Sequence, residues 1–341
     1  MRVWIRMAGA ALLLALAGGA VAQDQDAAFQ AYLPTLRGDA IAAGVRTETV
    51  DAVLPTLTLD PQVIRNDQAQ PAPVNSIAIT PFAPYRDQHV NAALIAGGRR
   101  VWAAQRGRLA AIERETGVPE AIMVAIWGHE TSYGAVTGRY DLLRSLATLA
   151  FEGRRRSLFA GEFVAALKML DRGVPREKLK GSWAGAFGGP QFLPSVYLKL
   201  ARDGDGDGFA DVWTSDADTL ASIGSYLQDA GWRPGRPWGL AVGVPPGFAR
   251  PGVRSRLIAP RCPRVFVRHS AWRSIAEWRG AGLVPQAGGW PADDVLATLI
   301  EPDGEGATAY LLTDNYRAIL DYNCSNFYAL SVGLLADAVA R

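Results

Sequence analysis

The sequence predicts a mainly α-helical protein of the α+β class, with a helical core and a small β-containing insertion. Apolar residues recur at helical spacing along most of the chain between residues 85 and 231. After Trp232 the sequence becomes dense in Gly and Pro and then shows short runs typical of strands. The last twenty residues return to a helical pattern.

The first 22 of the 341 residues form a separate element. A short basic stretch, MRVWIR, precedes an apolar run and the small-residue pattern AVA at 20–22. This order predicts a secretory signal peptide cleaved after Ala22, and hence a periplasmic protein. The alternative is an uncleaved membrane anchor, but the apolar run is short for a bilayer span. No Cys lies near the cleavage site, which argues against a lipid anchor.

Charge gives the mature chain no general attraction to nucleic acid. The full chain has 35 Lys and Arg against 33 Asp and Glu, and residues 1–22 remove Arg2 and Arg6. The mature chain then has no formal net charge, so we expect neither a nucleic-acid partner nor binding to an anionic membrane. We expect a monomer, with no transmembrane segment once the signal peptide is removed.

The predicted elements follow in order. Residues 26–55 read as two amphipathic helices separated near Gly44, and residues 60–84 as a loop. Further helical patterns are expected at 85–116, 117–132, 141–151, 155–170, 181–200 and 216–231. Strands are expected at RVFVRHS (264–270), ATLIEP (297–302) and AYLLTD (309–314), with PDGEG as a turn between the last two.

These elements suggest five regions. The signal peptide occupies 1–22, an N-terminal helical region 23–84, a catalytic core 85–240, a small β-containing subdomain 241–315, and a C-terminal helix 316–341.

Glu130 stands where the helical pattern calls for an apolar residue. Ile122, Ile126 and Glu130 are spaced four apart and share one helix face, and Gly134 is a candidate left-handed cap. Burial and the negative end of the helix dipole both raise a carboxyl pKa. A carboxyl that holds its proton near neutral pH suits a general acid. The alternative is a structural Glu paired with Arg or Lys.

A second segment, GSWAGAFGGPQFLPSVY at 181–197, combines small residues with Gln191 and Phe192. Glycines allow a close backbone approach, and polar groups beside aromatic rings suit a sugar site. The alternative is tight helix–helix packing.

Residues 118–138, which contain Glu130, and residues 181–197 resemble the lytic murein transglycosylase B family, as do DGDGDGFADVW (203–213) and YNCSNFYAL (322–330). The resemblance runs from about Ala28 to the C-terminus. It implies a lysozyme-like helical catalytic core and cleavage of the peptidoglycan glycan with Glu130 as the single acid/base and no catalytic cofactor. It also implies substrate contacts from ten residues: Tyr85, Arg154, Arg155, Ser182, Gln191, Phe192, Tyr226, Tyr322, Asn323 and Tyr328. Leu158 stands where the family often has Tyr, so that position is not carried over.

The implied product is a 1,6-anhydromuramic end, formed without water. Two alternatives remain: a hydrolytic muramidase on the same fold, and a catalytically silent glycan-binding scaffold.

The acidic loop ARDGDGDGFADVWTSD has the spacing of an EF-hand loop. Asp203, Asp205, Asp207 and Asp211 occupy positions 1, 3, 5 and 9, and the Phe209 carbonyl would supply position 7. Thr214 replaces the usual acid at position 12. We expect a structural Ca²⁺ site with irregular ligation, the alternative being a solvated acidic turn. Asp216 is expected to cap the next helix.

Two cysteines remain, Cys262 and Cys324. In an exported chain they are expected to form one disulfide, the alternative being two buried thiols.

Overall fold

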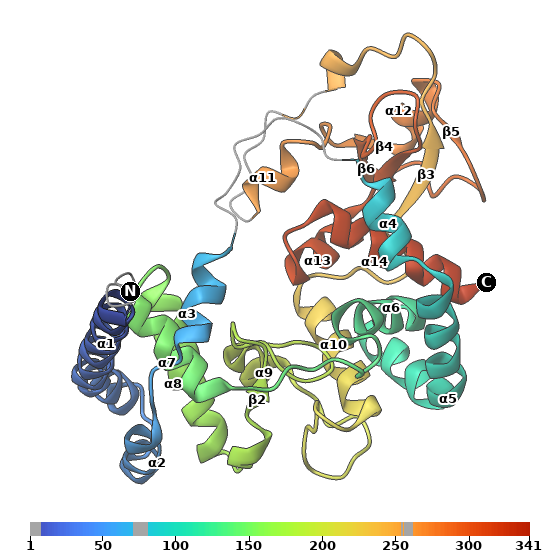
Figure 1. The fold of residues 1–341 in the computed structure, drawn as a ribbon. Helices are drawn as coiled ribbons and strands as arrows, with labels where there is room; N and C mark the ends of the chain where they lie inside the picture. Colours follow the sequence, from blue (N-terminus) through green and yellow to red (C-terminus); the bar gives the residue numbers. More distant parts are fainter. Residues whose placement is uncertain (1–7, 71–80, 254, 256–261) are drawn as a thin grey trace. The chain divides into compact units, whose positions relative to one another are not determined.

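The computed structural model describes residues 8–70, 81–253, 255 and 262–341 (Figure 1). The chain divides into two compact units. The first comprises residues 1–72, 137–187 and 191–199, and the second comprises residues 73–136, 188–190 and 200–341. Each unit is described by itself below. Residues 137–187 therefore group with the N-terminal helices, whereas the sequence-based division placed them with the catalytic core.

The first unit is helical. It contains α1 (Ala8–Ala42), α2 (Thr47–Val53), α3 (Pro61–Gln68), α7 (Leu142–Glu152), α8 (Arg156–Asp171) and most of α9 (Pro194–Leu200), with the short paired strands β1 (Tyr140–Asp141) and β2 (Lys180–Gly181). The break between α1 and α2 falls at Gly44, whose φ of +84° ends the first helix. Helix α3 lies within the predicted loop 60–84. It begins because the Asp60 side chain accepts hydrogen bonds from the first free N–H groups and Pro61 occupies the first turn.

The helices of the second unit are α4 (Ala83–His89), α5 (Ala92–Thr116), α6 (Glu120–Thr131), α10 (Asp216–Asp229), α11 (Pro263–Phe266), α12 (Ile275–Gly280), α13 (Asp314–Tyr322) and α14 (Asn326–Ala340). Helix α6 packs against α5, α10 and α14 (Figure 1). Its residues 121–128 are all buried, which makes it the centre of the helical core. The predicted helix 85–116 is broken after His89, because Asn91 starts α5 afresh as its N-cap.

A five-stranded antiparallel sheet completes the second unit. Its order is β4 (Arg273–Ser274), β6 (Leu296–Ile300), β7 (Ala309–Leu312), β3 (Gly239–Gly243) and β5 (Val284–Pro285). Its own apolar core includes Trp278, which is fully buried. The predicted strands at 297–302 and 309–314 are confirmed as β6 and β7, joined by the predicted turn.

Two other predictions were wrong. RVFVRHS begins with α11 rather than a strand, because Pro263 occupies the first helical turn. The predicted helix 181–200 is a loop up to Leu193, since Gly185, Gly188 and Gln191 all have positive φ, which an α-helix excludes.

Candidate active site

Glu130 lies in the last turn of α6, in the second unit. The helix ends because Ser132, Tyr133 and Gly134 all adopt left-handed backbone angles, with φ of 51°, 62° and 86°. The cap is therefore Ser132, one of three left-handed residues, where the sequence indicated Gly134. Burial raises the pKa of Glu130 to about 7, and a hydrogen bond from Tyr328 acts in the opposite direction. At neutral pH the carboxyl therefore populates both its protonated and its ionised form.

Tyrosines from three helices surround this carboxyl. The hydroxyl of Tyr328 donates to Glu130 Oε1 at 2.6 Å. The charge of Glu130 raises the pKa values of Tyr85 and Tyr322, in each case after the larger effect of burial. The Tyr322 ring lies 4.5 Å from that of Tyr226 and its hydroxyl donates to the Pro190 carbonyl at 2.5 Å. The structure therefore brings Tyr85, Tyr322 and Tyr328 to Glu130, with Tyr226 behind Tyr322.

Asn323 ends α13 as its C-cap residue and is exposed. It stands beside Tyr322 in the chain, on the segment that leads into α14.

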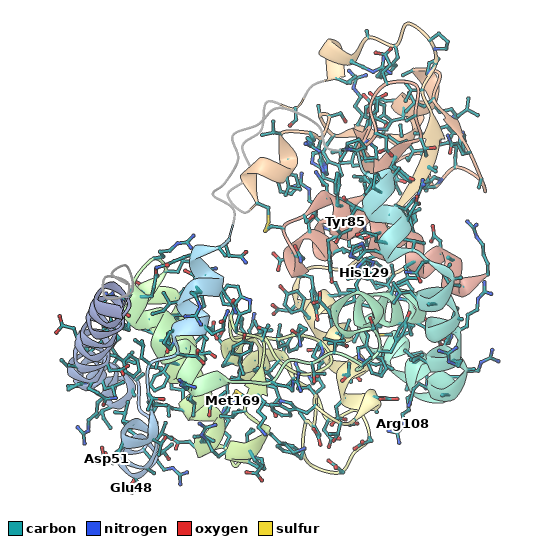
Figure 2. The ribbon with its side chains drawn as sticks, in the orientation of Figure 1. Glu48, Asp51, Tyr85, Arg108, His129 and Met169 are labelled. Carbon is teal, nitrogen blue, oxygen red and sulfur yellow. A yellow bond between two sulfur atoms is a disulfide. The ribbon has the colours of Figure 1, made fainter. Side chains whose placement is uncertain are left out.

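Two histidines extend this cluster, and the sequence analysis missed them. The His129 ring stacks on His89, with centroids 5.3 Å apart and planes 6° apart, and it meets Tyr328 edge-on at 5.3 Å. His89 in turn stacks on Tyr85 at 3.9 Å. Burial lowers the pKa of His129 to about 4, so its ring is neutral at pH 7. Tyr85 and His129 lie close together in this cluster (Figure 2). The four-residue spacing of Tyr85 and His89 was the available signal.

The glycine-rich segment 181–197 forms a tight loop that groups with the first unit, except for residues 188–190, which group with the second. Ser182 N–H donates to the Ala186 carbonyl at 2.7 Å, and Ala186 N–H donates to Ser182 Oγ at 3.0 Å. Phe187 and Phe192 exchange two backbone hydrogen bonds of 2.9 and 3.0 Å. Gln191 carries a φ of +51° at the turn between them. Ser182 and Gln191 are partly exposed, whereas Phe192 is only 2% exposed.

Arg154 and Arg155, the two arginines predicted to contact substrate, both pair with Asp67. Asp67 on α3 is completely buried. Its carboxylate accepts a hydrogen bond from Arg155 Nη2 at 2.6 Å and forms an ion pair with Arg154, whose Nη1 lies 3.2 Å from Oδ2 and donates to the Asp67 main-chain carbonyl. Each arginine side chain is nevertheless about half exposed, at 44% and 45%. A guanidinium has five N–H donors, so this ion pair leaves donors that face solvent.

Comparison with known proteins identifies the family. Residues 28–337 match the family described as Transglycosylase SLT domain. The chain belongs to this transglycosylase family. Over 261 residues it is 33% identical to membrane-bound lytic murein transglycosylase B of Escherichia coli, an alignment that spans 75% of this chain and 66% of that protein, just under two thirds of the relative's length. The resemblance inferred from the motifs is therefore confirmed.

Solved structures agree with this assignment. SltB3 from Pseudomonas aeruginosa in complex with NAG-anhNAM-pentapeptide is 35% identical, with a TM-score of 0.81 over 92% of this chain and 79% of that chain. Escherichia coli Slt35 in complex with calcium is 27% identical, with a TM-score of 0.74 over 90% of this chain and 92% of that chain. The chain thus has the lysozyme-like helical fold with a small sheet that the sequence predicted.

The carboxylates that gather at the acidic loop differ in part from the predicted ligand set. Carboxylate oxygens of Asp203, Asp205 and Asp218 lie within 4.8 Å of one another. Asp207 and Asp211 are turned to their own loop, where Asp207 Oδ1 accepts Phe209 N–H and Asp211 accepts the N–H groups of the following residues. Asp218 was missed because it lies on α10, beyond the loop motif. Ser215, not Asp216, is the N-cap of α10.

Cys262 and Cys324 are joined by a disulfide, with Cα atoms 5.4 Å apart. The bond ties the start of α11 to the segment between α13 and α14 that follows Tyr322.

Proposed function

We propose that this chain is an exported lytic transglycosylase of peptidoglycan. It cleaves the β-1,4 bond between N-acetylmuramic acid and N-acetylglucosamine and leaves 1,6-anhydromuramic ends. The observation that carries the proposal is Glu130, a buried carboxyl whose pKa is raised to about 7 and which accepts a hydrogen bond from Tyr328. The substrate strands carry peptides, as does the ligand in the SltB3 complex.

One carboxyl performs both proton transfers in this mechanism. Protonated Glu130 gives its proton to the glycosidic oxygen as the bond to C1 breaks. The N-acetyl group of the muramic sugar stabilises the positive charge that develops at C1. The Glu130 carboxylate then removes the proton of the C6 hydroxyl, and that oxygen bonds to C1. Tyr328 stabilises the carboxylate between the two steps, because its hydroxyl donates to the charged form.

The remaining site residues are proposed as substrate contacts. Tyr85, Tyr226, Tyr322 and Asn323 are the proposed glycan contacts in the second unit. The tyrosine rings suit packing against sugar faces, and the Asn323 amide can hydrogen-bond sugar hydroxyls. In the first unit, Ser182 and Gln191 contact the N-acetyl group and sugar, with Phe192 shaping their loop. Arg154 and Arg155 use their solvent-facing donors to meet a carboxylate of the peptide or of the muramic lactyl group. Their shared bond to Asp67 holds the pair in place.

The acidic loop is proposed to bind one structural Ca²⁺. Three carboxylates at this distance from one another fit the oxygen ligation that Ca²⁺ prefers. Asp203, Asp205 and Asp218 are the proposed carboxylate ligands, with the Phe209 carbonyl, Asp207 and Asp211 as further oxygens on the same loop. A calcium complex of the relative Slt35 supports this reading. Bound Ca²⁺ would order the loop and has no part in the proton transfers.

Export rests on the predicted signal peptide, cleaved after Ala22, and gives a periplasmic location. Among the helices that the structure describes, none has both the length and the apolar character needed to cross a membrane.

Analysis of the sugar ends tests the activity. The mature protein is incubated with purified sacculi, and the soluble products are examined by mass spectrometry. A lytic transglycosylase gives muramic ends lighter by one water than those of a muramidase. Reducing muramic ends would instead identify a hydrolase, and an absence of soluble products would identify a binding scaffold.

A further inference from the structure

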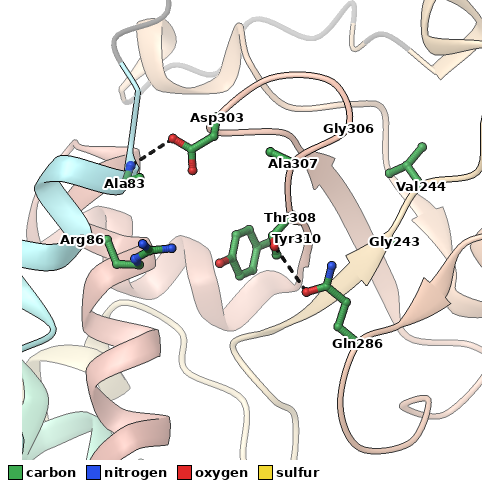
Figure 3. Close-up of a pocket in the computed structure, with 10 residues that line it drawn as sticks. All are labelled: Ala83, Arg86, Gly243, Val244, Gln286, Asp303, Gly306, Ala307, Thr308 and Tyr310. Atoms are coloured by element: carbon green, nitrogen blue, oxygen red, sulfur yellow. Dashed lines mark hydrogen bonds between the residues drawn. The ribbon is translucent and has the colours of Figure 1, made fainter.

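The second unit contains a cavity of about 560 Å³ to which the proposed mechanism assigns no role (Figure 3). It lies between the start of α4 and the ends of β3, β5 and β7. Its volume falls in the range of about 300–1,000 Å³ that is usual for small-ligand sites. The lining residues are Ala83, Arg86, Gly243, Val244, Gln286, Asp303, Gly306, Ala307, Thr308 and Tyr310.

The cavity exists because one strand pairing ends early. The ladder between β3 and β7 stops at Val242 and Ala309, whereas β3 continues for one more residue against β5, where Gly243 pairs with Val284. Beyond that point the chains on either side of the ladder separate. The wall left between them consists of small residues, Gly243, Gly306 and Ala307, so main-chain groups are accessible to a ligand.

Hydrogen-bond donors gather on one side of this cavity. The Tyr310 ring lies between Arg86 and Thr308, with its hydroxyl turned toward Arg86 (Figure 3). Arg86 donates to Asp87 through Nε and Nη2, which leaves further guanidinium N–H groups. Gln286 accepts a hydrogen bond from Thr308 through Oε1, and among the described residues its amide nitrogen donates to none.

An acceptor stands on the same rim. Asp303 Oδ1 accepts the Ala83 N–H at 2.9 Å, and a carboxylate oxygen can accept further bonds (Figure 3). The cavity therefore offers a cation with neutral donors, a carboxylate acceptor, and an accessible backbone beside small side chains.

We propose that this cavity binds the free carboxyl end of a short peptide with small side chains. The terminal carboxylate would meet Arg86 and the Tyr310 hydroxyl, a charge-assisted pairing that fits a planar guanidinium. The amide N–H of the last residue would donate to Asp303. Main-chain groups beyond the β3–β7 ladder would bond the peptide backbone, as in recognition by strand addition.

The natural source is the peptide carried by a peptidoglycan strand, and that choice of source rests on the activity proposed above. The preference for a carboxyl end depends only on the cavity. The site would hold a substrate peptide on α4, the helix whose other face carries Tyr85 and His89 toward Glu130.

An NMR titration tests the proposal with N-acetyl-D-alanyl-D-alanine as probe and its C-terminal amide as the matched ligand. The protein is the mature chain with Glu130→Gln, which removes turnover from the measurement. We expect the acid to shift the backbone signals of Gly243, Gly306 and Ala307, and the amide to bind at least about tenfold more weakly, as the loss of a charge-assisted bond predicts. Tyr310→Phe and Arg86→Gln should each weaken binding of the acid without changing the melting temperature.

Equal affinity for the acid and the amide would overturn the proposal, as would shifts confined to residues around Glu130. Unchanged affinity of Arg86→Gln for the acid would also overturn it. Arg86→Lys keeps the charge but not the planar guanidinium, so it should restore only part of the affinity. Because this titration involves no turnover, an absence of binding would not contradict the activity proposed for Glu130. An absence of activity on sacculi would likewise not contradict peptide binding in this cavity.

Discussion

Replacing Glu130 by Gln should make the protein more stable above pH 7 while it abolishes activity. Burial raises the pKa of Glu130 from 4.5 to about 7. The folded state therefore binds more protons than the unfolded state between these values, and stability falls as the pH rises through that window. Each pKa unit corresponds to about 1.4 kcal/mol, so ionised Glu130 costs the folded state up to about 3 kcal/mol at pH 8. The amide that replaces the carboxyl carries no charge, and its oxygen can still accept the Tyr328 hydroxyl.

Urea unfolding at pH 4 and pH 8 measures this difference. We expect wild type and Glu130→Gln to have similar free energies of unfolding at pH 4 and to differ by up to about 3 kcal/mol at pH 8, with the variant more stable. Turnover of sacculi should fall by at least about 10²–10⁴-fold, the usual contribution of one acid/base group. Glu48→Gln makes the same charge change at an exposed position and should alter neither quantity. If the variant is less stable than wild type at both pH values, the inference that burial raises the pKa of Glu130 is wrong.

Three further outcomes are expected. Tyr328→Phe removes the hydrogen bond that lowers the pKa of Glu130, so the basic limb of the pH–rate profile should move to higher pH. Tyr316→Phe, which removes a hydroxyl that donates to the Asn326 carbonyl, should leave the limb in place. Ca²⁺ at about 100 times its dissociation constant should stabilise the protein by about 2.7 kcal/mol. In thermal melts the Asp205→Asn variant should not show this stabilisation. A wild-type melting temperature that is the same with Ca²⁺ and with chelator would contradict the proposed site. Cys262→Ser should lower the free energy of unfolding by about 2–4 kcal/mol in urea titrations, because the bond closes a loop with a sequence separation of 62; an unchanged midpoint would contradict that.

The position of Glu130 could be predicted because its signal is local. The residues that place it lie within one helix, and the apolar spacing up to Ile126 fixes the face on which the carboxyl lies. The strands β6 and β7 were predictable for a similarly local reason, since each is a short apolar run and the Gly-containing segment 301–308 joins them.

Features that depend on distant segments could not be predicted in this way. Asp218 joins the acidic loop because α10 folds back on it, where Asp218 accepts Gly204 N–H and Asp211 N–H at 2.8 and 2.6 Å. The contact between His129 and Tyr328 joins residues about two hundred positions apart. A loop motif or a helical period contains no information about such contacts, which arise only from tertiary packing.

The opposing effects on Glu130 match what the two proposed proton transfers require of a single carboxyl. Burial in the helical core alone would hold the proton firmly, which favours protonation of the leaving oxygen but hinders the later removal of the C6 proton. The Tyr328 hydroxyl stabilises the carboxylate and so acts against burial. A group that must give and then accept a proton works best with a pKa near the ambient pH, and the value of about 7 meets that requirement. His129 packs edge-on against Tyr328 and stays neutral, so it supports the tyrosine without adding a charge that would disturb this balance.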